Sequence, residues 1–307
     1  MPVFRFRSFV APLVLVLTVV AACADRNRGR NGAADSANTK DIRDDFGEAV
    51  HVGRRPPTRI VSLNPTTTEI LFAIGAGPSI VGRTQYDLWP DSAKLVPSLG
   101  PGIRPNIEAV LATRPDLVVL YAGADNRPAA DLLRSAGIVV VAFKVDSIEE
   151  FRRVTRVLGA LVGDTARARA VVDSVDRTLQ RVAAATRTLA RPTVFFHSWE
   201  KPLLTIGGGS FMSELVAIAG GRNIYDSLSA PSPAVTLEDV VQRDPDIVLV
   251  SPIERAHMLA SAQWRVLRAV RDGHVLAYDT NLVARPSVKL GEAAVSLAQL
   301  LHPGVVR

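Results

Sequence analysis

The chain has 307 residues, of which 48% are hydrophobic and 21% are charged. That composition is typical of a folded globular protein, and the length is sufficient for two domains with cores of their own. The formal net charge is +6, or +4 without Arg5 and Arg7 of the N-terminal segment, and the excess is spread along the chain rather than clustered. Such a spread argues against a nucleic-acid-binding protein.

The N-terminus has the pattern of a bacterial lipoprotein signal. Within residues 1–22, two arginines precede a mostly apolar stretch that is too short for a comfortable membrane span. Residues 20–23 read Val-Ala-Ala-Cys and resemble the bacterial lipobox, and Cys23 is the only cysteine of the chain. We therefore predict a signal peptide over residues 1–22 and a lipid on Cys23. An ordinary signal peptide with an incidental cysteine and an uncleaved anchor helix are the alternatives.

Residues 23–57 are predicted to form a flexible tether. The stretch from Ala24 to Val52 mixes Asn, Asp, Arg, Gly and Ala with almost no large apolar residue. It therefore cannot bury enough surface to fold. The pattern becomes globular at Thr58.

An N-terminal α/β lobe is predicted over residues 58–145. Its first strand, Arg59–Leu63, is followed by Asn64, which begins a helix that carries Glu69. Short continuous apolar runs predict strands that are buried on both faces, as in a parallel sheet. The further strands predicted in this lobe are Ser79–Arg83, Leu117–Tyr121 and Ile138–Phe143.

A bridging helix is predicted over residues 146–191. Ser147 and Glu150 form the pattern of a capping box, and apolar residues then recur at helical spacing. After Gly163 the spacing resumes, and neither Gly nor Pro interrupts residues 165–190. One long helix is therefore expected there, between two lobes.

A C-terminal α/β lobe is predicted over residues 192–307. It ends in an amphipathic helix that begins at Leu290 and reaches Leu301. The strands predicted in this lobe are Thr193–Phe196, Leu203–Ile206, Ile247–Val250 and Val275–Tyr278.

A short motif occurs once in each lobe. Residues 107–120 (IEAVLATRPDLVVL) and 237–250 (LEDVVQRDPDIVLV) share an early glutamate, Glu108 or Glu238, a Pro-Asp pair and an apolar run. An N-cap residue precedes each copy, and the glutamate suits the first turn of a helix, where the helix dipole favours an anion. The proline ends the helix because it pushes the preceding residue out of the α region. The motif predicts helix, stop and buried strand, and its recurrence predicts two similar Rossmann-like lobes.

The sequence contains no recognisable catalytic motif. It has no G-x-x-x-x-G-K-[ST] loop, no H-E-x-x-H and no G-x-S-x-G. The five histidines show no spacing typical of metal ligands. We therefore expect no enzyme activity, no resident cofactor and no metal site.

Aromatic residues follow several of the predicted strands. Ligands of open α/β sheets gather at the carboxyl ends of the strands, so these side chains are expected to line a ligand cleft. Ordinary packing is the alternative for each of them. The candidates are Tyr86, Trp89, Tyr121, His197 and Trp199.

Several longer stretches carry a family resemblance. Residues 59–77 (RIVSLNPTTTEILFAIGAG), 80–90 (IVGRTQYDLWP), 107–120 and 284–303 (ARPSVKLGEAAVSLAQLLHP) resemble the substrate-binding proteins of ABC importers for cobalamin, siderophores and haem. The resemblance runs from about Arg59 to Pro303 and is greatest to the cobalamin-type members. It implies two α/β lobes joined by a rigid backbone helix, with the ligand cleft between the lobes.

The resemblance also implies roles for the aromatic candidates. In that family, aromatic residues of both lobes stack on the corrin ring and its nucleotide loop. Arg285 matches an arginine of the cleft, and Lys289 is a second candidate for meeting ligand anions. The aromatic residues that match in this sequence are Tyr86, Trp89, Tyr121 and Trp199.

Two positions depart from the family pattern. Leu99-Gly100 replaces an expected aromatic residue, and Ser232 stands where a tryptophan is usual. The cleft is therefore expected to be roomier or more polar than in the type case, which keeps an iron chelate open as the ligand.

A docking role for the repeated glutamates follows from the same resemblance. Each lobe of these proteins presents a surface glutamate that pairs with arginines on one of two permease subunits, and the matching positions are Glu108 and Glu238. The alternative is that both acids serve only the helix dipole.

These observations predict a monomeric, lipid-anchored extracytoplasmic receptor. It would deliver cobalamin or a related corrinoid to an ABC permease and its ATPase, with little movement of the lobes because a helix is a stiff link. A ferric siderophore and haem are the alternatives within the family. An enzyme and an envelope sensor on the same scaffold are the alternatives of another class.

Overall fold

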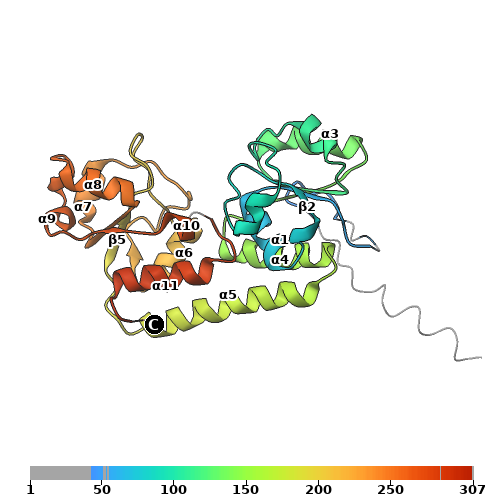
Figure 1. The fold of residues 1–307 in the computed structure, drawn as a ribbon. Coiled ribbons are helices and arrows are strands. Elements are labelled where there is room, and N and C mark those ends of the chain that lie inside the picture. The colour runs from blue at the N-terminus through green and yellow to red at the C-terminus, as the bar shows by residue number, and fades with distance from the viewer. Residues whose placement is uncertain (1–42, 51–52, 54, 284, 306–307) are drawn as a thin grey trace, which may run out of the picture. The chain divides into compact units, whose positions relative to one another are not determined.

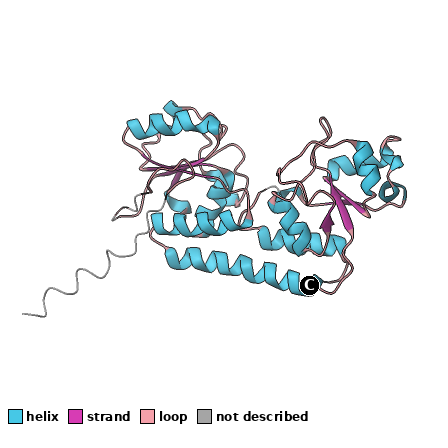
Figure 2. Ribbon diagram, turned by 180° about the vertical axis from the view of Figure 1, so that it is seen from behind, coloured by secondary structure: helices cyan, strands magenta, loops and turns pink. Residues whose placement is uncertain are grey.

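The computed structural model describes residues 43–50, 53, 55–283 and 285–305. The predicted signal peptide, Cys23 and most of the predicted tether lie outside the described residues. The described part contains two four-stranded sheets in which every strand pair is parallel, and helices cover both sheets (Figures 1 and 2).

The first sheet has the strand order β2-β1-β3-β4. The central pair is in register from Ile60 opposite Leu117 to Leu63 opposite Leu120, and these four residues of β1 are all buried. Continuous apolar strands therefore lie where both faces of the sheet are covered. The strands are β1 (Ile60–Leu63), β2 (Ile80–Gly82), β3 (Leu117–Tyr121) and β4 (Val139–Phe143), and the helices are α1 (Pro65–Ala73), α2 (Ile107–Ala112) and α3 (Arg127–Ser135).

The second sheet has the order β6-β5-β7-β8 and repeats the arrangement of the first. Its strands are β5 (Thr193–Phe196), β6 (Arg222–Asn223), β7 (Ile247–Val250) and β8 (Val275–Ala277). Its helices are α6 (Phe211–Ile218), α7 (Leu237–Arg243), α8 (Pro252–Ala260), α9 (Arg268–Arg271), α10 (Thr280–Val283) and α11 (Leu290–Leu301).

The prediction of a strand over Leu203–Ile206 is wrong. Leu204 makes only isolated antiparallel bridges, to Trp199 and to Ala234, and joins no sheet. The two sides of β5 are occupied by β6 and β7, so the apolar run of residues 203–206 cannot pair with the strand that precedes it.

The repeated motif forms the predicted helix, stop and strand in both lobes. The side chains of Asn106 and Thr236 cap α2 and α7 by accepting hydrogen bonds from the third residue beyond them. The residue just before the proline has a positive φ in both copies, 49° for Arg114 and 40° for Asp244. The prediction is therefore confirmed, since the residue before each proline has left the right-handed α region.

The aspartate of the repeated Pro-Asp pair ties two strands of each sheet together. Asp116 accepts hydrogen bonds from the backbone N–H (2.8 Å) and the hydroxyl (3.0 Å) of Thr58, just before β1. Asp246 accepts the same two bonds, at 2.9 and 2.7 Å, from Thr193 at the start of β5. Both sheets thus use one device at the amino ends of their two central strands.

The bridging segment consists of two helices, α4 (Ile148–Leu161) and α5 (Thr165–Thr186), and α5 packs against α4 and α11. Ser147 and Glu150 form the predicted capping box. The 22 residues of α5 span about 33 Å at 1.5 Å per residue. One hydrophobic cluster includes residues of both lobes and of these helices, so the lobes share a continuous apolar core: Phe143, Leu158, Val182, Phe196 and Leu297 belong to it.

Residues 43–50 differ from the predicted tether because they pack on the first lobe. Asp44 is buried and accepts hydrogen bonds from Arg134 Nη2 (2.9 Å) and the backbone N–H of Ala142 (3.1 Å). Asp45 accepts from the backbone N–H of Lys144 at 2.7 Å. These acids cover β4, the edge strand, whose backbone groups would otherwise be unpaired. Phe46 and Val50 also pack against hydrophobic clusters, so polar and apolar contacts together hold the segment.

None of the helices in the described part of the chain is long and apolar enough to span a membrane.

Candidate functional site

Two tyrosines line a pocket at the carboxyl ends of the strands in the first lobe. Tyr121 is the last residue of β3, and Tyr86 lies in the loop after β2 and is 55% exposed. The pocket has a volume of about 360 Å³ and a mostly apolar wall, so it offers aromatic rings to a flat ligand. Its lining residues are Leu63, Asn64, Pro65, Tyr86, Pro101, Gly102, Ile103 and Tyr121.

Asn126 holds the walls of this pocket in place. Its side-chain amide is buried and donates hydrogen bonds to the backbone carbonyls of Gly102 and Tyr121, each at 3.0 Å. Its side-chain oxygen accepts from the backbone N–H of Arg104 at 3.0 Å. Gly102 lies so close to the carbonyl of Leu63 that a Cβ would collide with it. The sequence analysis missed Asn126, because its partners are brought to it only by the fold.

Tyr121 is oriented by Asp146, the third residue after the end of β4. The phenol oxygen donates to the carboxylate at 2.9 Å from Oδ2 and 3.1 Å from Oδ1. Burial and this hydrogen bond raise the pKa of Tyr121 to about 12, so the phenol remains a donor at neutral pH. The hydroxyl of Tyr121 is already hydrogen-bonded to Asp146, so a ligand would contact the face of the ring.

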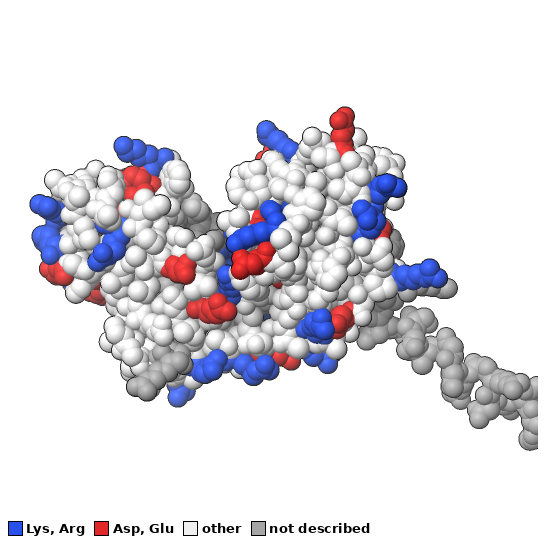
Figure 3. Space-filling view, viewed as in Figure 1, with Lys and Arg blue, Asp and Glu red and all other residues white. Residues whose placement is uncertain are grey.

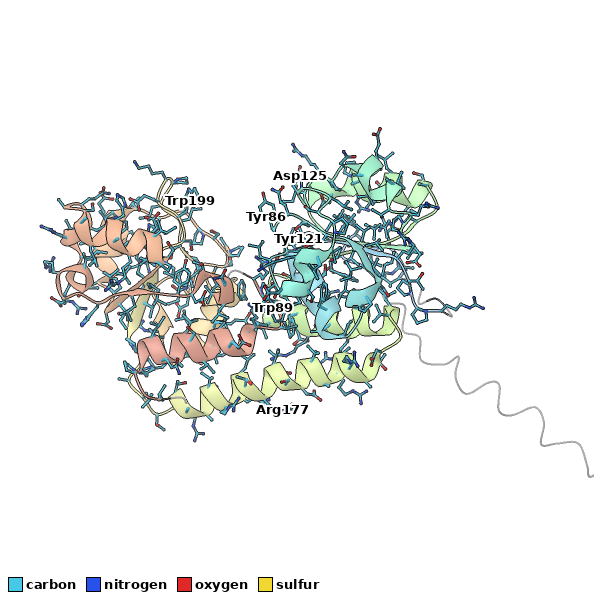
Figure 4. All side chains as sticks on the ribbon, in the orientation of Figure 1. Tyr86, Trp89, Tyr121, Asp125, Arg177 and Trp199 are labelled. Carbon is cyan, nitrogen blue, oxygen red and sulfur yellow. The ribbon has the colours of Figure 1, made fainter. Side chains whose placement is uncertain are left out.

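Arg285 lies beside this pocket and contacts the first lobe from a loop of the second. Its Nη1 is 3.4 Å from Glu69 Oε1 and 3.5 Å from the backbone oxygen of Tyr86. Lys289 Nζ lies 4.6 Å from the centre of the Trp89 ring, a cation–π contact that occupies one face of that ring. Figure 4 shows Tyr86, Trp89 and Tyr121 on the same lobe. The two predicted cations are therefore at the site, and each already contacts a residue of the first lobe.

Two buried acids, Glu69 and Asp87, interact with Arg285. The side chain of Glu69 is buried, and burial is the largest cause that raises its pKa; Arg285 acts in the opposite direction. Asp87 is 1% exposed, and burial likewise raises its pKa although it accepts a 2.7 Å hydrogen bond from the backbone N–H of Thr84. The sequence analysis placed Glu69 on a helix but did not connect it with Arg285.

The candidate residues Trp199 and Ser232 of the second lobe are both exposed. Trp199 is 61% exposed, and its indole N–H donates to the carbonyl of Lys201 at 3.1 Å. Ser232 is exposed in a loop. Neither residue lines the pocket of Tyr86 and Tyr121, which is formed by the first lobe alone.

His197 is buried in this structure, and its role as a ligand contact stays a prediction. It is 2% exposed, its Nε2 lies 2.8 Å from Glu200 Oε2, and its ring packs edge-on against Trp264 with centroids 5.5 Å apart. The carboxyl end of β5 was found correctly, but the imidazole faces the core and supports the loop that carries Trp199.

Glu108 and Glu238 are both exposed in the first turns of α2 and α7. Neither carboxylate makes an ion pair with another described residue. Each is therefore free to pair with a partner protein.

No group of three or more His, Cys, Asp or Glu residues in the described ranges is arranged to hold a metal ion.

Two helix-covered parallel sheets joined through long helices, with aromatic residues after the strands, define a two-lobed solute-binding protein. A family model described as periplasmic binding protein matches residues 60–282, and the chain belongs to this family. Its members are solute-binding components of ABC importers rather than enzymes.

Individual relatives of this chain are also solute-binding proteins by name. The chain is 30% identical to a cobalamin-binding protein of Halobacterium salinarum, over 80% of this chain and 70% of that protein. It is 26% identical to an uncharacterized ABC transporter substrate-binding lipoprotein of Bacillus subtilis, over 95% of this chain and 96% of the relative. A periplasmic heme binding protein from Pseudomonas aeruginosa has a similar structure, with a TM-score of 0.71, 25% identity and coverage of 81% of this chain and 94% of the other.

Proposed function

We propose that this protein captures cobalamin or a related corrinoid outside the cytoplasm and delivers it to an ABC permease and its ATPase. The observation that carries the proposal is the apolar pocket of about 360 Å³ with two tyrosine rings, beside which Arg285 lies. The cobalamin-binding relative, at 30% identity, supports the choice of ligand.

The pocket is a subsite rather than a complete binding site. Its volume is near the lower end of the roughly 300–1,000 Å³ that small-molecule sites occupy, and a corrinoid with its nucleotide loop is larger than such a space. Tyr86 and Tyr121 would stack on one part of the ligand, and Trp199, exposed on the second lobe, would contact another part. Arg285 would meet an anionic group such as a phosphate, in competition with Glu69.

Titration with cyanocobalamin tests the ligand. Tyr86→Ala and Tyr121→Ala should each weaken binding by about 1–3 kcal/mol through lost apolar contact and stacking. Ile253→Ala removes an exposed apolar side chain of α8, far along the chain from the pocket, and should leave the affinity unchanged. Quenching of tryptophan fluorescence that disappears in Trp199→Phe would place the ligand at both lobes.

A haem or ferric-siderophore receptor is the second candidate. It is favoured by the similarity to the heme binding protein and by Leu99-Gly100 and Ser232, which depart from the aromatic pattern that the resemblance to cobalamin-type members implies. Competition of haem and a ferric siderophore against cyanocobalamin decides between them, since only the true ligand should bind with an affinity that depends on Tyr86.

We further propose that the receptor is anchored by a lipid on Cys23. The sequence of residues 20–23 and the lipoprotein relative support this anchor. Cys23→Ser should move the protein from the membrane fraction to the soluble fraction; equal membrane retention would refute the anchor.

A further inference from the structure

Helix α5 and the five residues that follow it form a strongly basic stretch. Residues 165–191 contain six arginines and two aspartates, a net charge of +4, while the whole chain has +6. The positive excess is spread along the chain, and this stretch is one of the places where it is locally dense. Figure 3 shows basic side chains along the edge of the molecule that α5 forms.

The arginines of α5 point away from the core. The buried face of the helix consists of Ala168, Val172, Val175, Leu179, Val182 and Thr186. With about 100° between successive residues, Arg177 lies opposite that face, and Arg169, Arg181 and Arg187 flank it. All four are exposed.

Most of this positive charge is not neutralised within the protein. Arg169, Arg177 and Arg187 make no ion pair or side-chain hydrogen bond with another described residue, and Arg181 donates only to the hydroxyl of Thr178, at 3.1 Å. Asp173 is the one exposed acid among them. The second aspartate, Asp176, is paired with Arg152 of α4 at 2.8 Å.

The shape of the charged face indicates the kind of partner. From Arg169 to Arg187 the charges extend over about 27 Å of helix, which is too long for one small anion. The other residues exposed on this face include Ala166, Ala170 and Ala184, so it lacks the large apolar or aromatic anchors that protein interfaces use. A long, straight and shallow row of cations fits a flat surface of many anions.

We propose that the arginine row of α5 (Arg169, Arg177, Arg181 and Arg187) binds the anionic headgroups of phospholipids at the membrane surface. The contact is electrostatic and involves no insertion, because the face carries no large apolar residue. Figure 4 shows Arg177 on the edge of the molecule away from Tyr86, Tyr121 and Trp199. A receptor lying on α5 would therefore keep its aromatic residues open to ligand. The proposal is independent of the ligand and of the lipid on Cys23.

The test uses the chain from Ala24 onward, which lacks Cys23 and the apolar N-terminal segment but keeps the compact unit Ile42–Arg307. It should co-sediment with vesicles of phosphatidylcholine and phosphatidylglycerol but not with vesicles of phosphatidylcholine alone. Binding should disappear in high salt, because the Debye length falls from about 10 Å at 0.1 M to about 3 Å at 1 M.

Matched charge removals locate the contact. Arg169→Gln, Arg177→Gln and Arg187→Gln together should lower the partition coefficient at least about tenfold, since one basic residue near an anionic surface contributes roughly fivefold. Arg114→Gln, Arg222→Gln and Arg265→Gln together remove the same charge from exposed, unpaired arginines elsewhere and should change it less than about twofold.

Three results would overturn the proposal. They are no binding to phosphatidylglycerol vesicles, equal losses in the two triple variants, and binding to a soluble polyanion such as dextran sulfate without binding to vesicles. Equal melting temperatures of the two triple variants show that any difference does not come from unfolding.

Discussion

Tyr121 illustrates how neighbouring residues determine what a side chain can offer. Its place after a buried strand indicated a ligand contact, and the structure puts it in the wall of a pocket. The hydrogen bond to Asp146, which the sequence analysis did not foresee, engages the hydroxyl. The ring is held by its own lobe before any ligand arrives, and such preorganisation lowers the entropy lost on binding.

Arg285 and Glu69 show a competition that the sequence did not indicate. The arginine was expected to meet ligand anions, and in the structure it faces a buried carboxylate 3.4 Å away. A ligand anion must therefore draw Arg285 away from Glu69 or share it. Two other neighbours, Lys289 and Asp87, shift the pKa of Glu69 in opposite directions, and burial outweighs them.

Glu69→Gln is expected to raise the melting temperature at neutral pH. Burial raises the pKa of Glu69 above its ordinary value of 4.5, so the ionised form is less favourable in the folded than in the unfolded chain. The gain in stability of the variant over the wild type reaches its largest value at pH values above the pKa of Glu69 in the folded protein. It vanishes below about 4.5, where both states of the wild type are protonated.

Thermal unfolding of both proteins from acid to neutral pH measures this difference, with Glu292→Gln, an exposed acid of α11, as the control. A lower melting temperature of Glu69→Gln at neutral pH would contradict the prediction. It would mean that pairing with Arg285 outweighs the burial of the carboxylate.

At the scale of elements, the repeated motif has a structural reason beyond its helix and its strand. The Pro-Asp pair ends the helix and then fastens the start of the next strand to its neighbour, through Thr58 in one sheet and Thr193 in the other. The sequence analysis explained the proline but gave the aspartate no role. Its partner in each lobe lies more than 50 residues away in the chain.

Asp246→Asn is expected to lower the free energy of unfolding by about 1–2 kcal/mol at neutral pH, since two hydrogen bonds from Thr193 weaken. The bonds from Thr193 and then Arg268 lower the pKa of Asp246 from 3.8 to about 2. This stabilisation is therefore present above about 3.8 and is lost as the pH falls towards 2. The ion pair with Arg268 is partly exposed and contributes little of it.

Urea unfolding at neutral pH and near pH 3 checks this prediction, and the gap between variant and wild type should narrow at the lower pH. Asp116→Asn repeats the neutral-pH experiment in the first sheet. Asp272→Asn, an exposed aspartate outside the motif, should have almost no effect. Loss of stability in all three variants alike would remove the special role of the motif.

At the scale of the whole molecule, the two lobes each present one unpaired carboxylate at the start of an equivalent helix, Glu108 on α2 and Glu238 on α7. Two such carboxylates could each pair with one subunit of a symmetrical permease. The apolar core that continues through α4 and α5 keeps the two lobes joined, so both acids can engage together.

Glu108→Ala combined with Glu238→Ala should abolish or strongly reduce uptake. A carboxylate paired at an interface can be worth about 2–5 kcal/mol, whereas an exposed first-turn acid contributes only about 0.3–1 kcal/mol to its own helix. Ligand affinity and melting temperature should therefore change little. Charge reversal to arginine should impair uptake further.

Uptake by cells that carry each variant is the measurement, with Asp131→Ala on α3 as an exposed acid outside the motif. Normal transport by the double alanine variant would rule out docking through these residues. A loss of stability in step with transport would show that the acids serve only their helices.

Most of the strands and the long helices could be predicted from local patterns in the sequence, whereas β6 was missed and the strand predicted over Leu203–Ile206 does not form. Periodicity and continuous apolar runs are local properties, so β1, β3, β4, β5 and β7, the long helix α5 and the capping box of α4 could be predicted within a residue or a few. The rule that ligands gather after strands likewise found Tyr86 and Tyr121, because both lie on the first lobe close to strand ends.

Which side chains contact one another could not be predicted from local patterns. Asn126 with Gly102, Glu69 with Arg285, and Asp44 with Arg134 are partners separated by 24, 216 and 90 residues. His197 follows its strand as predicted, but its contacts with Trp264 and Glu200 come from the fold and could not be predicted. A hydrogen bond or an ion pair depends on distances of a few ångströms, and those distances are fixed by packing of the whole chain rather than by any local pattern.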